Sequence, residues 1–133
     1  MIVELLSTGS FIDHKVNSVL KEYGITHVQF NILRILQGAN GEALSPGVIS
    51  DRMLFKNSDV TRLMDRLEKR ALISRNICPE NRRKMDIRLE KKGLKLISDV
   101  LPKIESDLNG FFKDVVSPKE RDQLLKTLSK IQS

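Results

Sequence analysis

The chain has 133 residues, a length that fits one compact domain. Its composition, 40% hydrophobic and 30% charged, excludes the collagen-like and disordered classes. The single cysteine, Cys78, excludes a disulfide framework, and residues 1–13 lack a basic leader and a small-residue cleavage site. No apolar run approaches the roughly 20 residues that cross a membrane, so we expect a cytoplasmic protein with no membrane partner.

The net charge of +6 is concentrated in the middle third of the chain. The segment 52–95 carries 14 Lys and Arg against 6 Asp and Glu, a net charge of +8, whereas the remaining residues sum to −2. Charge concentrated in this way favours a polyanionic partner. The alternative is a basic face that only meets solvent, and charge alone does not choose between the two.

Two helices are predicted before the basic segment. Apolar residues recur at three- and four-residue steps over residues 2–23, which indicates an amphipathic helix, although Gly9 favours a later start. Thr26 and Gln29 have the spacing of a capping box, and the helix that they open is apolar on most sides. We therefore expect this second helix to be buried, and to end at the glycines and asparagine of residues 38–41.

Two shorter helices follow within the basic segment. Ser45 and Pro46 combine a cap with an N1 proline, which predicts a short helix to about Met53. After a turn, a further helix is expected over about 58–70, with one apolar stripe. Its opposite face carries Thr61, Arg62, Asp65, Arg66 and Lys69.

The hydrophobic period then changes to two. Met85, Ile87 and Leu89 alternate with charged residues, a pattern typical of a half-exposed strand, and Ile73, Arg75 and Ile77 alternate less cleanly before them. Residues 79–83 lie between these runs as the loop of a hairpin. A basic hairpin directly after a helix is the layout of a wing.

Two further amphipathic helices complete the chain. A continuous apolar stripe predicts a long helix over about 91–115, in which Pro102 should produce a kink. Ser117, Pro118 and Glu120 give a second capping box with an N1 proline. The stripes of the first helix and of these two exceed what one small domain can cover, which favours a dimer. Packing within one chain is the alternative.

This order of elements resembles a winged helix-turn-helix, and particular residues resemble the MarR family (multiple-antibiotic-resistance regulators). The similarity covers about residues 25–132. It is carried by Thr26–Leu33 before the reading head, Leu44-Ser45, the recognition-helix sequence Asp59–Arg70, the wing tip Pro79-x-Asn81-Arg82-Arg83, and Leu89, Gly93 and Pro102. The resemblance implies one mainly α domain over 1–133 with a small β-hairpin wing. Residues 25–90 would form the winged helix-turn-helix DNA-binding lobe, and residues 1–24 and 91–133 the flanking dimerisation helices.

Three positions depart from the family's pattern. The wing usually has Asp where this chain has Asn81, so a charge that would brace the wing arginines is missing. The glycine after the recognition helix is Ala71, and the threonine that opens the next helix is Glu90. None of these changes removes a DNA contact, but Asn81 puts the rigidity of the wing in doubt.

The resemblance assigns DNA contacts to the recognition helix, the turn before it and the wing. Arg62 is expected to contact a base or phosphate, because arginine can bind guanine with two donors. Arg82 is expected to enter a minor groove. Alternatively, Arg66 pairs with Asp65 or Glu68, and Arg83 pairs with Asp65. The residues expected to contact DNA are Ser45 (mainly a helix cap), Lys56, Asn57, Ser58, Asp59, Thr61, Arg62, Arg66, Arg82, Arg83 and Lys84.

The implied function is sequence-specific binding of double-stranded DNA by a homodimeric transcription regulator. The resemblance favours a repressor that binds a pseudo-palindromic operator and is released from it by a small aromatic effector. Phe11, His14, Tyr23 and Phe30 could line the effector site, although Phe11 and Phe30 are residues of a kind more often found in a core.

Other function classes have weaker support. An enzyme is not expected, because the sequence has no phosphate loop or metalloprotease motif, and His14 and His27 have no obvious acid partner. No cofactor or metal site is expected. A redox-responsive regulator acting through Cys78, whose neighbours are basic, is one alternative, and a winged-helix module that binds protein is another.

Overall fold

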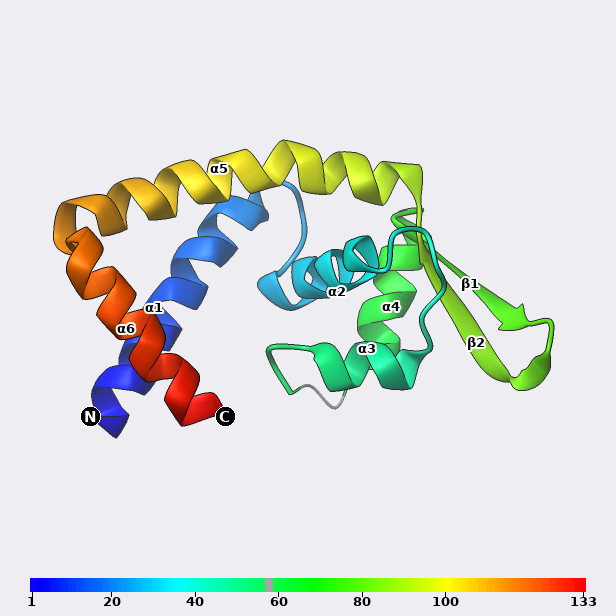
Figure 1. Cartoon of the computed structure of the whole chain (residues 1–133). Helices are drawn as coiled ribbons and strands as arrows, with labels where there is room; N and C mark the ends of the chain where they lie inside the picture. Colours follow the sequence, from blue (N-terminus) through cyan, green and yellow to red (C-terminus); the bar gives the residue numbers. More distant parts are fainter. Residues whose placement is uncertain (57–58) are drawn as a thin grey trace. The chain divides into compact units, whose positions relative to one another are not determined.

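The computed structural model describes residues 1–56 and 59–133. These residues form six helices and one antiparallel hairpin (Figure 1), which confirms the mainly α fold with a small β element. The chain divides into two compact units, residues 1–101 and residues 102–133.

The first two helices belong to the first unit. α1 (Ile2–Lys21) begins at once, so the expectation that Gly9 would delay its start was wrong. A single glycine weakens a helix by only about 1 kcal/mol, which the other residues of a 20-residue helix offset. α2 (His27–Gly38) has the predicted capping box, in which Thr26 and Gln29 each accept a backbone N–H of the other. As expected, α2 is largely buried.

The helix-turn-helix pair is α3 (Pro46–Arg52) and α4 (Val60–Lys69). Ser45 caps α3, as predicted, by accepting the backbone N–H of Val48 at 3.2 Å. The core of this unit is formed by α1, α2, α3, α4, the hairpin and the first part of α5. Its fully buried large side chains are Leu20, Ile32, Leu33, Leu36, Ile49, Met64, Leu67, Leu72, Ile73, Ile87, Ile97 and Val100.

The hairpin joins β1 (Ile73–Cys78) to β2 (Asn81–Leu89). Cys78 pairs with Asn81, so the turn is only Pro79 and Glu80, and the predicted five-residue loop over 79–83 was wrong. The side-chain alternation could not show this, because it does not specify which residues face each other across the strands. Leu44 adds an isolated bridge to Ile87 through two backbone hydrogen bonds of 2.9 Å.

A backbone contact at Leu72 closes the base of the hairpin. The N–H of Glu90 donates to the carbonyl of Leu72 at 3.0 Å. A Cβ added to Gly93 would lie 2.3 Å from that carbonyl oxygen, so only glycine fits there. Ala71, directly before this contact, has φ +57°, in the left-handed region that favours glycine. The family's glycine at this position therefore has a physical reason.

α5 (Lys91–Val115) begins in the first unit and runs unbroken through Pro102, where the second unit starts. α6 (Pro118–Gln132) has the predicted capping box between Ser117 and Glu120. The Ser117 hydroxyl holds the pKa of the Glu120 carboxyl below its ordinary value. None of the residues of α6, all of which are described, is buried. Apolar side chains exposed on α1, α5 and α6 include Leu5, Leu6, Phe11, Leu94, Val115, Leu124, Leu125 and Ile131.

Candidate nucleic-acid interface

α4 presents one apolar and one polar face, as predicted. Met64 and Leu67 are buried in the core, whereas Thr61, Arg62 and Arg66 are exposed. The guanidinium of Arg66 has no ion pair among the described residues, so the alternative in which it pairs with Asp65 or Glu68 was wrong. The exposed face of α4 therefore offers two arginines and a hydroxyl to a partner.

The N-terminal end of α4 carries a mixed set of polar groups. Asp59 is the N-cap residue, and one of its carboxylate oxygens lies 3.9 Å from a guanidinium nitrogen of Arg62. Both side chains are well exposed, so this pair is weak and leaves Arg62 able to turn toward a ligand. Lys56 is exposed in the preceding turn. Asn57 and Ser58, also predicted to contact DNA, lie outside the described residues.

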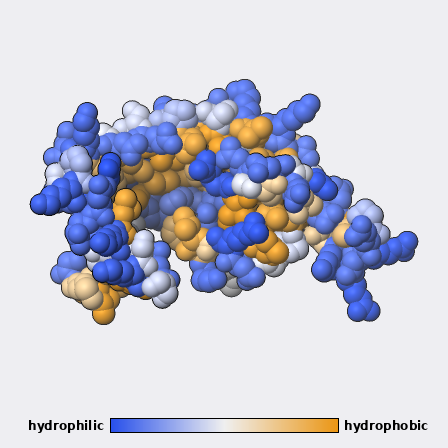
Figure 2. Space-filling view, viewed as in Figure 1, coloured by the Kyte–Doolittle hydropathy of each residue, from blue (hydrophilic) through white to orange (hydrophobic). Residues whose placement is uncertain are grey.

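The wing arginines lie on β2 and not in a loop. Between the pairs Ile77–Met85 and Cys78–Asn81, β2 has three extra residues, Arg82–Lys84, that face no residue of β1. All three are exposed, and none has an ion pair within the described ranges. The hairpin surface is mostly hydrophilic in Figure 2. This bulge concentrates three cations at the end of the hairpin.

Asn81 braces this bulge without a charge. Its side-chain oxygen accepts the backbone N–H of Arg83 at 3.1 Å, a short-range turn that asparagine forms readily. Compared with the family's Asp, Asn81 therefore lacks the negative charge but still forms a hydrogen bond that holds the bulge.

Arg75 connects the hairpin to α4, a role that the sequence analysis missed. Its Nη2 lies 2.5 Å from a carboxylate oxygen of Asp65 and 2.9 Å from one of Glu68. Arg83 has no ion pair among the described residues, so the alternative in which it pairs with Asp65 was wrong. The hydrogen bond from Arg75 lowers the pKa of the Glu68 carboxyl, and the same pairing raises the pKa of Arg75. Ile73 is buried, and residues two apart on a strand point to the same face. This spacing could have predicted that the Arg75 side chain points inward.

A second arginine joins α4 to the connection between α1 and α2. The guanidinium of Arg70 donates to the carbonyls of Tyr23 and Gly24, both at 2.9 Å. Gly24 has φ +71°, which turns these carbonyls in a way that only glycine adopts freely. The C-terminal end of α4 is thus tied to the end of α1.

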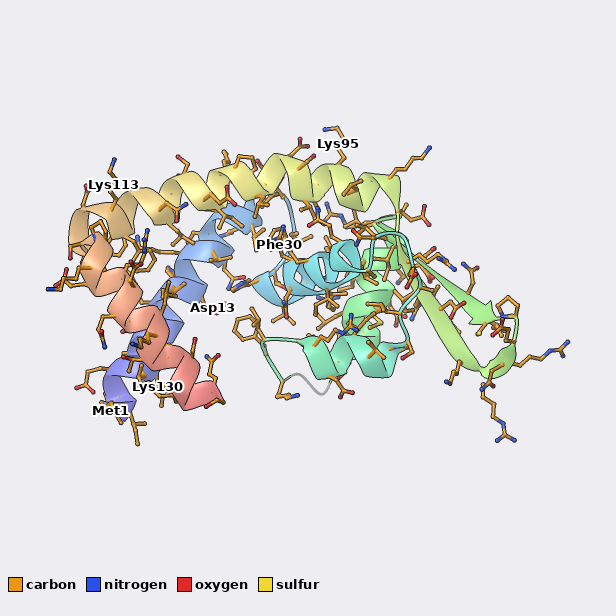
Figure 3. The ribbon with its side chains drawn as sticks, viewed as in Figure 1. Met1, Asp13, Phe30, Lys95, Lys113 and Lys130 are labelled. Atoms are coloured by element: carbon orange, nitrogen blue, oxygen red, sulfur yellow. The ribbon has the colours of Figure 1, made fainter. Side chains whose placement is uncertain are left out.

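The four residues predicted to bind an effector are not gathered in one place. Phe11 and His14 line an open hollow of about 630 Å³ on α1, together with Leu6, Ser7 and Ser10. The ammonium of Lys15 lies 5.0 Å from the centre of the Phe11 ring. Tyr23 is half-buried, and Phe30, labelled in Figure 3, is buried in the core. Neither lines the hollow, so the structure supports two of the four residues as neighbours.

His27 has an acid partner, contrary to expectation. Its Nδ1 donates to a carboxylate oxygen of Asp13 at 2.7 Å. Cys78 is a half-buried free thiol at the end of β1. Among the described residues, no three His, Cys, Asp or Glu side chains are grouped to hold a metal ion. A search of the same residues finds no helix with the length and apolar character needed to span a membrane.

Comparison with known proteins places this geometry in context. A model of the MarR family matches residues 23–84. The transcriptional repressor MprA of Escherichia coli is 30% identical over 117 residues, which cover 88% of the chain but 66% of MprA, just under two thirds of its length.

Two solved structures share the fold. The S. aureus MepR–DNA complex has a TM-score of 0.84 at 22% identity, over 99% of the chain and 96% of MepR. The organohalide-sensing regulator RdhR, bound to 2,4-dichlorophenol, has a TM-score of 0.84 at 23% identity, over 98% of the chain and 76% of RdhR. The arrangement of α3, α4 and the hairpin is thus a winged helix-turn-helix.

Proposed function

The chain belongs to the MarR family, and from this premise we propose that it is a sequence-specific DNA-binding transcription repressor, not an enzyme, acting in the cytoplasm as a homodimer. The observation that carries the proposal is the pair of basic elements on one compact unit. α4 exposes Arg62 and Arg66, and the hairpin exposes the three cations of residues 82–84. Arg75 holds the two elements together.

In the proposed complex, α4 enters the major groove, which is about 12 Å wide and admits a helix. Arg62 is the residue proposed to read a base, because its guanidinium is exposed and, among the described residues, has one weak ion pair, with Asp59. Thr61 and Arg66 lie on the same exposed face and would contact phosphates or base edges. Lys56 would contact the backbone of the duplex beside them. Ser45 keeps its role as a cap, since its oxygen already accepts a helix N–H.

The bulge of the hairpin would contact the neighbouring minor groove. A narrow minor groove has a strongly negative potential that attracts arginine. Arg82 is the proposed groove residue, with Arg83 and Lys84 beside it on phosphates.

The dimer is proposed from the exposed apolar side chains of α1, α5 and α6. A two-fold dimer would present two copies of α4 to a pseudo-palindromic operator, with half-site centres about 10 bp apart. We further propose that a small aromatic effector releases the DNA. RdhR binds 2,4-dichlorophenol, and the hollow beside Phe11 and His14 is the candidate site in this chain.

The decisive experiment is selection of bound sequences from a random duplex pool, followed by titration of the selected site with the wild type and with Arg62→Ala. Loss of a base-reading arginine should weaken binding by about 1–3 kcal/mol and relax specificity at one position of each half-site. Arg34→Ala is the matched control, because Arg34 is exposed on α2 and bonds only to Gln37 among the described residues. A chain that enriches no duplex, and binds no random duplex at low salt, would instead fit a protein-binding module.

A further inference from the structure

Two side chains of α2 reach the turn that leads to the DNA-reading helix. Asn31, only 8% exposed, accepts the backbone N–H of Leu54 on its side-chain oxygen at 2.9 Å. One helical turn earlier, the His27 ring packs edge-on against Phe55, with ring centroids 4.9 Å apart. Residues four apart lie on the same face of a helix, so both contacts come from one side of α2.

Two residues of α1 hold His27 in position. The ring is hydrogen-bonded to Asp13, and Asn17 accepts the backbone N–H of His27 at 2.9 Å. Asn17 also donates to the carbonyl of Asp13 at 3.0 Å. Asp13 lies on α1 beside the N-terminal end of α2 (Figure 3). The His27 side chain is 17% exposed and that of Asp13 is 40% exposed, so the bond is shielded from water on the His27 side only.

Residues 53–56 have no regular secondary structure, and the Leu54 side chain is 75% exposed. Within these four residues, Met53 is the one that is buried, and its N–H donates to the carbonyl of Ser50 at 3.4 Å. The contacts of Asn31 with Leu54 and of His27 with Phe55 therefore help to fix the position of this turn and of Lys56, its last described residue.

We propose that His27 and Asn31 are positioning residues for DNA binding, with Asp13 orienting His27. They hold the turn in the geometry that the bound state requires, so that little ordering remains to be done when DNA binds. This role rests on the proposed function. It connects α1 to the turn before α4 through the hydrogen bond of Asp13 with His27 and the ring contact of His27 with Phe55.

The test measures amide hydrogen exchange and DNA affinity in the same variants. Asn31→Leu introduces an apolar side chain of similar size and leaves the Leu54 N–H without its acceptor. We expect the Leu54 amide to exchange about tenfold faster. We also expect duplex affinity to fall about three- to tenfold, the equivalent of one hydrogen bond. The amides of Leu44 and Ile87, which bond each other in the hairpin bridge, should exchange as in the wild type.

Variants of Asp13 test the hydrogen bond between Asp13 and His27. Asp13→Ala should weaken binding about threefold or more, whereas Asp13→Asn keeps an acceptor for His27 and should restore it. Asp99→Ala is the matched control: it removes the same charge from an exposed ion pair with Lys95 on α5, and should change nothing.

Three outcomes would overturn the proposal. Unchanged affinity in Asn31→Leu and Asp13→Ala, with a wild type that binds DNA, removes the positioning role alone. A loss of affinity in which Leu44 and Ile87 lose protection as much as Leu54 shows that the whole lobe is loosened, and that the residues only stabilise the fold. A wild type that binds no duplex overturns the proposed function, and this role with it.

Discussion

Replacing Arg82 with alanine tests whether the hairpin contacts DNA or only solvent. Arg82 is the first of the three bulge residues of β2 that face no residue of β1. It is exposed and has no ion pair among the described residues, so its removal should leave the free protein almost unchanged. Surface substitutions of this kind usually alter stability by less than about 0.5 kcal/mol. Any effect on DNA binding therefore reports on the complex.

The magnitude follows from counterion release. Each phosphate that a protein neutralises contributes about 0.9 to the slope of log Kobs against log salt. A dimer carries two hairpins, so Arg82→Ala should reduce the slope by about two units. Between roughly 50 and 200 mM salt, the affinity difference between wild type and variant should then shrink about tenfold. The effect should be similar on operator and random duplex, because the wing would act mainly through charge and groove shape.

The assay is fluorescence anisotropy of both duplexes across this salt series. Lys126→Ala is the control, because Lys126 is an exposed cation on α6, outside the unit that carries the hairpin. It changes the net charge equally and should leave the slope near the wild-type value. If Arg82→Ala also leaves both slope and affinity unchanged, the hairpin is a solvated loop and DNA binding rests on α4 alone.

Four further predictions concern stability and assembly. Gly93→Ala should lower the free energy of unfolding by about 3 kcal/mol in urea titration, because its Cβ would lie 2.3 Å from a backbone oxygen. Ala71→Gly should raise it by about 0.5–1 kcal/mol, because glycine relieves the strain of φ +57° while adding freedom to the unfolded chain. Arg75 lowers the pKa of Glu68, so that pair stabilises the fold above the ordinary glutamate pKa of about 4.3 and stops doing so as acid protonates Glu68. Thermal melts of Glu68→Gln should therefore change less between roughly pH 3 and 5 than wild-type melts. Leu124→Asp should yield a folded monomer in sedimentation, because Leu124 is 50% exposed in the single chain; a persistent dimer would contradict the proposed seam.

The sequence predicted the features that depend on short-range chemistry. Thr26 with Gln29, and Ser117 with Glu120, satisfy helix N–H groups three residues apart, so their pattern is sufficient to locate the helix starts. The outward arginines of α4 followed from its 3.6-residue period in the same way.

Features that depend on tertiary pairing could not be obtained in this way. Alternation indicated the hairpin, but the strand register decides that Arg82–Lys84 form a bulge on β2. Arg75 selects Asp65 and Glu68 only once β1 lies against α4. His27 and Asp13 are 14 residues apart on separate helices, and only the packing of α1 on α2 brings them together.

The segments on both sides of α4, the helix proposed to read DNA, contact helices whose apolar side chains are exposed. Before α4, His27 and its partner Asp13 connect the turn at Leu54 and Phe55 to α1. After α4, Leu72 meets the first turn of α5 at Gly93. This second contact is backbone against backbone, so no change of rotamer can absorb a shift of that turn. A movement of α1 or of the start of α5 would therefore act on the segments that flank α4, and we expect assembly of the proposed dimer through these helices to influence the position of α4 on DNA.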